Sequence, residues 1–334
     1  MKTILSKRIF TVQDCPGYNS WPMLQNIGQR LVCAYSRGTR HDIAEIPRSL
    51  YARVSDDGGL TWQSETLIAD TPGCGDVAIG KGLDENGQML LWNRAVNGSL
   101  YGKKGALRHS LFRSPDGIHF TCVSTPDLDP EPMQITDVFH VPSIGLVAFW
   151  FSGTYRDDDF QHAWGMLTST DNGCSWKQTV IESGLSKSEW PTEPSALYLG
   201  DGHIFVIART ESGPSQFQLE TFDYGKNWTK QRTNISDVKI STPSLLLNKE
   251  TGSVSNYYYH RTQGLLKRRQ VFLKNIIGHP LDWPEPEIVT EGSAECIDAG
   301  NVNAVSLNGR HYIAYYSGKS PDTSVYVAEV PEKA

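Results

Sequence analysis

Three charged residues stand at the ends of apolar stretches, where their types suit work on an acidic ligand. Arg209 follows the run Ile-Phe-Val-Ile-Ala, Arg261 follows Tyr-Tyr-Tyr-His, and Glu193 opens a Glu-Pro-Ser sequence. An arginine guanidinium pairs with a carboxylate through two parallel hydrogen bonds, which a lysine cannot do. A glutamate becomes an acid or a base when burial and neighbouring charges adjust its pKa. These residues therefore fit the binding and cleavage of a carboxylate-bearing ligand, although strand-end arginines also pair with neighbouring acids as plain structure.

Two adjacent residues, His41 and Asp42, are candidates for donating a proton. Either side chain does so near neutral pH only if its site tunes the pKa, and otherwise is simply solvated. Glycoside cleavage takes two carboxyl groups, or a carboxyl group and a substitute, flanking an oxocarbenium-like transition state. Glu193 with His41 or Asp42 would meet this requirement. Trp21 and Trp190 each adjoin a proline at an expected strand entry, where an aromatic face can stack on a sugar ring.

One turn motif, Ser/Thr-x-Asp-x-Gly-x-x-Trp, marks the elements that must position these residues. Full copies begin at positions 55, 169 and 221, a copy shortened by one residue begins at 114, and a degenerate copy is expected at 274–283. In such a turn the Asp side chain accepts hydrogen bonds from backbone N–H groups, and the Gly supplies a positive φ. We therefore expect these aspartates to build turns and to take no part in chemistry.

The spacing of the copies predicts a closed ring of sheets. They lie about 52 to 59 residues apart, so 334 residues accommodate about six units. Residues 49–55 and 203–209 alternate as half-buried strands do, and no stretch has sustained helical periodicity. Repeated four-stranded units form propellers, whose radial closure protects the sheet edges. We expect an all-β, six-bladed β-propeller in which the first and last segments share a blade and residues 1–334 form one domain.

Composition argues against several other classes of protein. The formal net charge of -6 disfavours nucleic-acid binding, which usually needs a clustered basic surface. No apolar run approaches the ~18–20 residues that cross a bilayer, so we expect no membrane insertion. The N-terminus lacks the features of a signal peptide, which predicts a cytoplasmic protein or one released by lysis or carried on a virus particle. Six scattered cysteines form no Cys-x-x-Cys pair, and we expect neither a metal nor a cofactor.

The turn motif resembles the Asp box, or BNR repeat, of the sialidase superfamily, and the resemblance extends over nearly the whole chain. Residues 192–210 are similar to the sialidase strand pair that opens with Glu-Pro-Ser and ends with Ala-Arg. The resemblance implies that Glu193 is a catalytic base and that Arg209 holds the carboxylate of the sugar. It implies the same carboxylate-binding role for Arg261, with Arg268 as the second choice.

The N-terminal part of the chain extends this resemblance. Residues 35–42 are similar to the sialidase region that carries a binding arginine and the acid/base aspartate. This similarity implies substrate contacts for Arg37 and proton donation by Asp42. Asp76 stands where the family often has an aspartate that contacts the substrate.

Two positions depart from the pattern of exo-acting sialidases. Trp21 stands where those enzymes have the first arginine of a triad, and Asn301 stands where they have a tyrosine nucleophile; we expect both to contact the sugar. The departures resemble phage endosialidases, which cleave inside polysialic acid with a Glu, two Arg and a His. A similar set occurs here in the same order, at His41, Glu193, Arg209 and Arg261. Without the tyrosine, Glu193 would activate water directly, which favours inversion at the anomeric carbon.

These features favour a glycoside hydrolase that releases sialic acid or a related acidic sugar from a glycan, including endo-acting cleavage of polysialic acid. Two alternatives stay open. One is a carbohydrate-binding propeller without catalysis, consistent with Trp21 and Asn301. The other is a propeller-type polysaccharide lyase, whose base would come from residues 257–260 beside Arg261. A glutamate next to an acidic ligand weakens binding unless it has a chemical role, which argues against binding alone.

Overall fold

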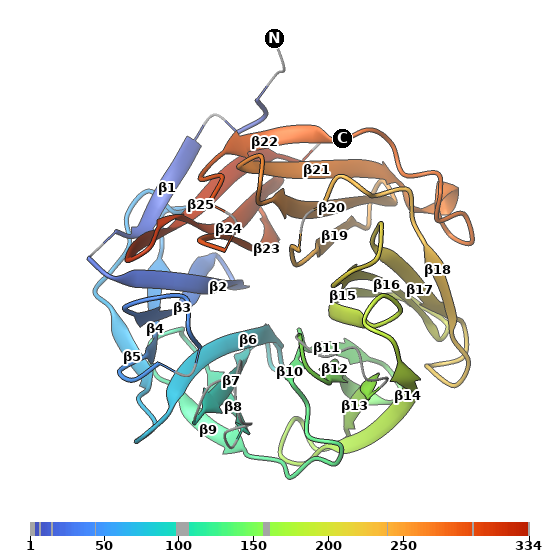
Figure 1. The fold of residues 1–334 in the computed structure, drawn as a ribbon, viewed down its shortest axis with the longest axis horizontal. Helices are drawn as coiled ribbons and strands as arrows, with labels where there is room; N and C mark the ends of the chain where they lie inside the picture. The colour runs from blue at the N-terminus through green and yellow to red at the C-terminus, as the bar shows by residue number, and fades with distance from the viewer. Residues whose placement is uncertain are drawn as a thin grey trace.

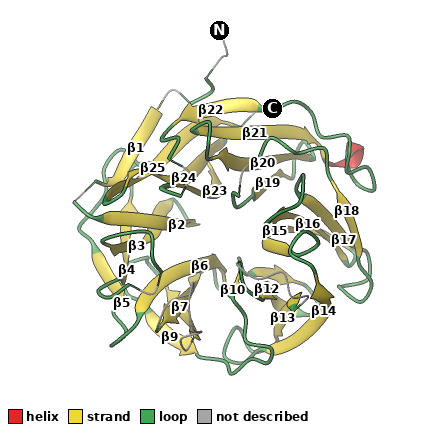
Figure 2. Ribbon diagram, viewed as in Figure 1, coloured by secondary structure: helices red, strands yellow, loops and turns green. Residues whose placement is uncertain are grey.

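The computed structural model describes residues 4–6, 8–14, 16–43, 45–97, 107–155, 161–238, 240–295 and 297–332. Their strands are arranged around a central opening, and the chain runs round this ring from its N-terminal to its C-terminal end (Figure 1). Regular structure in these ranges is β-strand except for one short 3-10 helix, η1(Leu273–Asn275) (Figure 2). The expected all-β, propeller-like arrangement is confirmed. The helix of the described ranges is too short and polar to cross a membrane.

The strands of the described ranges form five hydrogen-bonded sheets. Three sheets have four strands each: β6(Gly75–Leu83), β7(Met89–Val96), β8(Leu107–Ser114) and β9(Thr121–Ser124); β15(Pro191–Gly200), β16(His203–Thr210), β17(Phe217–Thr221) and β18(Thr229–Arg232); and β19(Ser244–Asn248), β20(Ser253–His260), β21(Leu265–Phe272) and β22(Glu287–Glu291). A fourth sheet has five strands: β10(Gln134–Ile135), β11(Phe139–Val141), β12(Gly145–Ser152), β13(His162–Ser169) and β14(Lys177–Leu185).

The remaining sheet has eight strands and closes the ring. It contains β1(Arg8–Gln13), β2(Tyr18–Ile27), β3(Arg30–Gly38), β4(Ser49–Ser55), β5(Thr66–Ala69), β23(Ala299–Leu307), β24(Arg310–Lys319) and β25(Asp322–Pro331). Strand β1 pairs antiparallel with β25, which confirms that the first and last segments share a sheet. A single parallel pair, Tyr18 with Thr323, joins β2 to β25. This pair merges two antiparallel groups, so five sheets are counted where the repeat predicts six.

The repeated aspartates build turns, as expected. In the turn after β13, Asp171 accepts hydrogen bonds from the Ser169 hydroxyl at 2.8 Å, the Ser175 N–H at 2.9 Å and the Ser175 hydroxyl at 2.5 Å. These bonds, that of the Ser175 hydroxyl foremost, lower the pKa of Asp171 to about 2. The turns at Asp57 and Asp223 repeat the pattern. The carboxylates are thus committed to local structure at the edge of the sheets.

The tryptophans of these turns tie each sheet to its neighbour. The ring of Trp176, after β13, lies 5.3 Å from the ring of Trp92 in β7, and Trp228 lies 5.5 Å from Trp164 in β13. Aromatic pairs at such distances stabilise beyond the area they bury. The degenerate copy expected at 274–283 is not a turn of this kind: its residues form the end of η1 and a connection to β22, although Trp283 is 3% exposed.

Gly173 provides a direct test of the turn geometry. Its φ is +91°, and a Cβ there would lie 2.9 Å from Leu111 Cδ2, so Gly173→Ala combines backbone strain with a clash. We expect a loss of more than ~1 kcal/mol in the free energy of unfolding. Gly87→Ala is the matched control, because Gly87 has a φ of +75° and a Cβ there would meet no other atom within 4 Å. Equal losses in urea denaturation would show that packing between sheets at this turn contributes nothing.

Candidate active site

Four non-glycine residues with left-handed backbone angles line one cavity between the inner strands of the ring. Their φ values are 51° at Trp21, 46° at Glu193, 43° at Ile240 and 50° at Asn301. This conformation costs an L-residue roughly 1–2 kcal/mol, and such strain is concentrated at functional sites. At Trp21, Glu193 and Asn301 the ladder register also shifts, as at a β-bulge, which re-aims a side chain. Strands β2, β15 and β23 thus each contain a bulge at which one residue with a positive φ is directed into the cavity.

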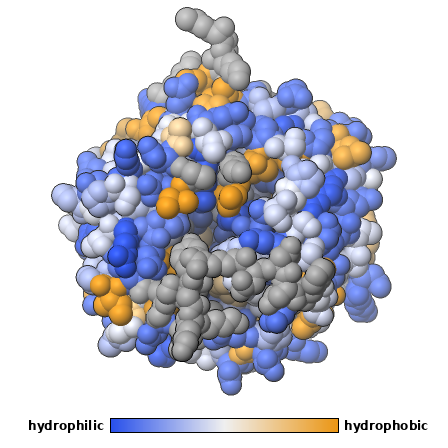
Figure 3. All heavy atoms as spheres, viewed as in Figure 1, coloured by the Kyte–Doolittle hydropathy of each residue, from blue (hydrophilic) through white to orange (hydrophobic). Residues whose placement is uncertain are grey.

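The cavity holds about 890 Å³ of space that is open to solvent. Its polar and aromatic lining residues are Trp21, His41, Arg94, Gln134, Tyr155, Glu193, Arg209, Glu211, Arg261 and Asn301. Aliphatic residues, chiefly isoleucines, complete the wall. The face seen down the ring axis is mostly hydrophilic, with hydrophobic side chains in small groups (Figure 3). A few converging polar groups on a partly apolar wall are typical of a small-molecule site, and a sugar offers both kinds of surface.

Arg209 joins the two carboxylates of the cavity. Its Nη1 donates to Glu193 Oε2 at 2.8 Å, and its Nη2 lies 2.5 Å from Glu211 Oε1. Glu193 Oε2 also accepts a hydrogen bond of 2.7 Å from the hydroxyl of Thr242. Arg209 lies near the end of β16, and Glu211 is the first residue after that strand.

The two carboxylates differ in their affinity for a proton. Burial opposes the charge of Glu193, but Arg209, the Thr242 hydrogen bond and Arg261 outweigh it and lower the pKa of Glu193 below its usual value. Burial also opposes the charge of Glu211, and there it prevails over Arg209, so the pKa of Glu211 is raised. Two neighbouring carboxyl groups whose pKa values are pushed apart are what acid/base catalysis requires.

Arg261 brings a buried charge to the cavity wall without a partner. The residue is 6% exposed, and no described residue forms a hydrogen bond with its buried Nε. Its place is kept by Gly300, whose φ is +114° and where a Cβ would lie 3.0 Å from Arg261 Nε. An unpaired buried guanidinium is costly unless a ligand supplies the missing charge and acceptors. The guanidinium of Arg261 is therefore able to pair with an anion that enters the cavity.

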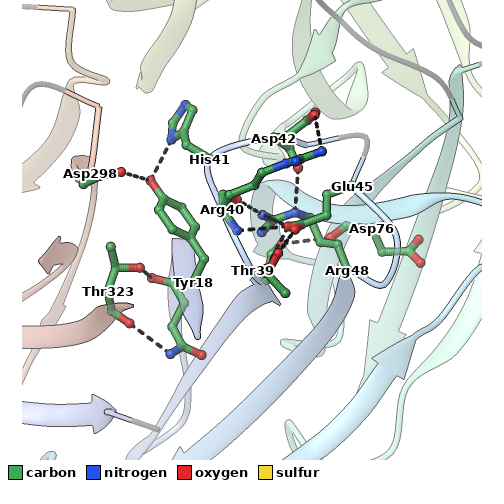
Figure 4. Close-up of polar contacts among 12 residues, drawn as sticks. Tyr18, Thr39, Arg40, His41, Asp42, Glu45, Arg48, Asp76, Asp298 and Thr323 are labelled. Carbon is green, nitrogen blue, oxygen red and sulfur yellow. Dashed lines mark hydrogen bonds and ion pairs between the residues drawn. The ribbon is translucent and has the colours of Figure 1, made fainter. Parts of the chain in front are cut away.

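His41 lies on the connection between β3 and β4, which an internal ion pair holds. Arg48, fully buried, pairs with Glu45 at 3.0 Å, and Glu45 accepts a hydrogen bond of 2.8 Å from the Thr39 N–H (Figure 4). Burial, and then the charge of Arg261, lowers the pKa of His41 to about 4. His41 is therefore neutral near pH 7, which is the wrong protonation state for the acid that the sequence suggests.

Six of the residues expected at the site from the sequence do line this cavity. They are Trp21, His41, Glu193, Arg209, Arg261 and Asn301. They come from three sheets that lie on different sides of the central opening (Figure 1). The Thr242 hydroxyl, which donates to Glu193, lies 3.2 Å from the side-chain oxygen of Asn301. The structure therefore brings together residues that are far apart in the sequence.

Two of the expected binding arginines lie away from the cavity. Arg37 pairs with Glu65 at 2.8 Å and stacks its guanidinium 4.3 Å from the centre of the Tyr51 ring. Arg268 is 1% exposed and pairs with Glu287 at 2.8 Å. The prediction that these two residues hold the substrate is wrong, because each guanidinium is already committed to a carboxylate outside the cavity wall.

The two expected aspartates also lie outside the cavity lining. Asp76 is fully buried and accepts hydrogen bonds from the backbone and hydroxyl of Thr71 and from Asn93, so its carboxylate is structural. Asp42 lies beside Arg40, 3.6 Å from its guanidinium, on the connection that carries His41 (Figure 4), and it is not among the residues that line the cavity. Neither aspartate is placed to touch a ligand in the cavity.

Four polar lining residues were not anticipated from the sequence: Arg94, Gln134, Tyr155 and Glu211. Glu211 directly follows the strand that carries Arg209, and this nearness in the sequence was the available signal. Arg94 carries no comparable signal. Three arginines and two carboxylates line the cavity, which leaves an excess of positive charge suited to an anion. In the described part of the chain, no group of three or more His, Cys, Asp or Glu is arranged to hold a metal ion.

A family comparison agrees with the repeated turns. Residues 29–276 match the model of the BNR repeat-like domain, which is more than half of the chain. The chain belongs to the BNR repeat-like family. This agrees with the Asp-box turns that the sequence repeats. No curated protein matches the sequence.

Solved structures of distant relatives have the fold of this BNR repeat-like protein. A Dyadobacter fermentans protein of unknown function is 17% identical with a TM-score of 0.79, and the alignment covers 98% of each chain. Trypanosoma rangeli sialidase in complex with sialic acid is 13% identical with a TM-score of 0.68, covering 98% of this chain and 58% of that one. The phage phi92 endosialidase is 11% identical with a TM-score of 0.66, covering 99% and 70%. At these identities the likeness concerns the fold alone.

Glu211→Gln tests the electrostatics of the carboxylate pair in this BNR repeat-like protein. Because the folded pKa of Glu211 is raised, the wild type loses stability as the pH rises through the unfolded and then the folded pKa. Glu211→Gln should therefore gain stability relative to wild type at neutral pH, with a smaller gain at pH 4, in urea denaturation. Glu189→Gln, at a carboxylate with 52% side-chain exposure, is the control. A neutral-pH loss in Glu211→Gln would mean that its pairing with Arg209 outweighs the cost of burial.

Proposed function

We propose that this protein is a glycoside hydrolase of the sialidase type, which cleaves sialic acid or a related acidic sugar from a glycan. The observation that carries the proposal is the buried guanidinium of Arg261, which faces the cavity without a described partner. A sugar carboxylate supplies the charge and the acceptor oxygens that this group lacks. Trp21 and the isoleucines of the wall offer apolar contact to the faces of the ring.

The two glutamates supply the chemistry for this proposal. Glu211, whose pKa is raised, is suited to hold a proton and give it to the leaving oxygen. Glu193, whose pKa is lowered, stays ionised and stabilises the positive charge of an oxocarbenium-like transition state, or acts as the base. Asn301, in the place of a sialidase tyrosine, has no nucleophilic oxygen of comparable reactivity. Direct attack by water, with inversion at the anomeric carbon, therefore follows from this set of residues.

A second, smaller cavity adjoins the first and supports action within a longer glycan. It shares Arg209, Glu211 and Ile240 with the first cavity, and its other lining includes Ser212 and Ser241. Glu211 therefore lies where the two cavities meet. With the acidic sugar in the first cavity, the glycosidic oxygen would lie near Glu211 and the leaving sugar would enter the second. This arrangement agrees with endo-acting cleavage, including that of polysialic acid.

We also propose that the ring is best counted as six blades. In the eight-stranded sheet, the two halves share one ladder pair among the described residues, that of Tyr18 and Thr323, beside side-chain hydrogen bonds such as those between Asn19 and Thr323. Counting β2 to β5 apart from β23 to β25 with β1 gives six units, which agrees with the spacing of the turn motif.

A polysaccharide lyase is the second candidate, favoured by one observation. His41 is neutral and lies near Arg261, and a neutral base beside a carboxylate-binding arginine is what β-elimination of a uronate needs. Among the residues 257–260 expected to supply that base, Tyr257, Tyr258 and Tyr259 are fully buried, and neither they nor His260 line the cavity. An unsaturated product that absorbs in the ultraviolet would identify a lyase.

Activity on a panel of acidic glycans tests the proposal. The purified protein should release acidic sugar from sialosides of the common linkages or from polysialic acid. Arg261→Lys should lower kcat/KM roughly 10- to 100-fold, since a hydrogen bond to a charged group contributes ~1.5–3 kcal/mol. Glu193→Gln should lower kcat by roughly 100-fold or more. Arg261→Lys removes the planar guanidinium that would pair with the sugar carboxylate. Glu193→Gln removes the fixed negative charge that would stabilise the transition state.

Arg37→Lys is the matched control, because Arg37 also ends a strand but pairs with Glu65 outside the cavity. Its activity should equal that of the wild type, and all variants should keep the wild-type melting temperature within a few degrees. If no acidic glycan is cleaved by the wild type, the hydrolase proposal fails while the fold stands. Equal losses in Arg37→Lys and Arg261→Lys would show that Arg261 has no special place in binding.

A further inference from the structure

A chain of hydrogen bonds runs from the cavity into the wall behind it. The Tyr18 hydroxyl lies 2.7 Å from His41 Nδ1 and 2.8 Å from Asp298 Oδ1. His41 lines the cavity, whereas Tyr18 is fully buried and Asp298 is 6% exposed. Figure 4 shows the three side chains in sequence, with the second ring nitrogen of His41 directed away from Tyr18. The chain joins a group at the cavity surface to a carboxylate that a ligand does not reach.

The Tyr18 hydroxyl has two neighbours that only accept, Asp298 Oδ1 at 2.8 Å and the more distant Ile297 carbonyl oxygen at 3.3 Å. Asp298 accepts at both oxygens, because Oδ2 takes a hydrogen bond of 2.9 Å from the Ser320 N–H while Oδ1 takes one from Tyr18. A hydroxyl has a single proton, so Tyr18 donates it to Asp298 and must accept from His41. His41 therefore carries its proton on Nδ1. In a neutral ring this leaves Nε2 with a free lone pair.

We propose that Asp298 and Tyr18 are positioning residues that fix the tautomer of His41, so that its Nε2 takes a proton from the attacking water. The base role builds on the proposed hydrolase function, whereas the tautomer assignment does not depend on it. Nε2 of His41 has no hydrogen-bond partner among the described residues, as this role requires.

The charges around His41 favour the neutral ring that a base needs. Burial is the largest influence, Arg261 and Arg48 also disfavour a second proton, and Asp298 and Asp42 act in the opposite direction. Together they place the pKa of His41 at about 4, so the ring is neutral above that pH. Burial, with Tyr316 and Asp298, raises the pKa of Tyr18, which keeps its proton throughout. Tyr18 therefore works as a fixed link in the chain.

The proton and electron pairs balance in the resulting step. The water oxygen forms a bond to the anomeric carbon as the glycosidic carbon–oxygen bond breaks. His41 Nε2 takes one proton from that water, and Glu211 gives its proton to the leaving oxygen. Glu193 remains ionised and stabilises the charge on the sugar. Exchange with solvent returns the proton of His41 and restores that of Glu211, so the sum is addition of one water across the bond.

The tautomer can be observed directly by nitrogen-15 NMR of the histidine rings, with His41→Gln used to assign the signal. In the wild type at pH 7 we expect a protonated Nδ1 and an unprotonated Nε2. In Asp298→Asn, the amide oxygen stays at the Ser320 N–H and the amide nitrogen faces Tyr18. Tyr18 then accepts from the amide, and its proton turns to His41 Nδ1 at 2.7 Å in preference to the more distant Ile297 carbonyl oxygen at 3.3 Å, which moves the ring proton to Nε2. A wild-type proton on Nε2, or an unchanged ring in Asp298→Asn, would overturn the proposal.

Steady-state kinetics tests whether the hydrogen bonds from Asp298 through Tyr18 to His41 contribute to the rate of the reaction. Tyr18→Phe keeps the ring and removes the link, so kcat should fall at least 10-fold while KM changes little, and Asp298→Asn should lower kcat by about 100-fold. Tyr257→Phe is a close control, because the Tyr257 hydroxyl lies 2.7 Å from His311 Nδ1 in a buried pair of similar geometry outside the cavity lining. Equal effects of Tyr18→Phe and Tyr257→Phe on kcat would overturn the positioning role. Failure of the wild type to hydrolyse any acidic glycan would defeat the base role, while the spectra decide the tautomer separately.

Discussion

The arrangement of the cavity depends on Arg209, which holds two buried carboxylates at once. Removing one partner of a buried ion pair leaves an uncompensated charge, which is far more costly than losing a pair on the surface. Glu193 and Glu211 are fixed by the same guanidinium, at 2.8 Å and 2.5 Å. Because both carboxylates pair with Arg209, stronger pairing of one with the guanidinium weakens the pairing of the other. This competition, together with unequal hydrogen bonding, separates their pKa values and gives the pair two different roles.

The sheets provide the frame that makes such an arrangement possible. Asp-box turns join β4 to β5, β13 to β14 and β17 to β18, and their tryptophans pack from one sheet onto the next. The strained residues lie in other strands, where β2, β15 and β23 each bulge to direct one residue into the cavity. The turns that stabilise the frame and the bulges that line the cavity thus belong to different strands. The residues that repeat in the sequence serve the frame, and the residues that differ between repeats serve the cavity.

Sequence patterns predicted this frame well because each turn is a local structure, in which Asp171 bonds residues only a few positions away. The inward-facing residues Trp21 and Glu193 could also be predicted from the sequence, because each precedes a proline near the start of a strand. Arg37 and Arg268 were misjudged because, in the sequence, a guanidinium on a strand looks the same whether it faces a ligand or a carboxylate. Their partners, Glu65 and Glu287, are brought to them only by the fold.

Other features could not be predicted because they depend on distant contacts. Tyr18 and Asp298 meet across 280 positions of the chain, and the closure of the ring is what brings them together. The same closure merges two groups of strands through Tyr18 and Thr323, so the number of separate sheets differs from the number of repeats. The pKa of His41 likewise reflects burial among residues from several sheets. A short polar loop in the sequence gives no indication of that burial.

The central claim is that Arg261 awaits the carboxylate of an acidic sugar, and a crystal structure with sialic acid bound tests it most directly. The account predicts a sugar in the cavity with its carboxylate within hydrogen-bond distance of the Arg261 guanidinium, its anomeric carbon between His41 and Glu193, and Glu211 toward the second cavity. A sugar whose carboxylate binds elsewhere, with Arg261 still unpaired beside it, would contradict the account.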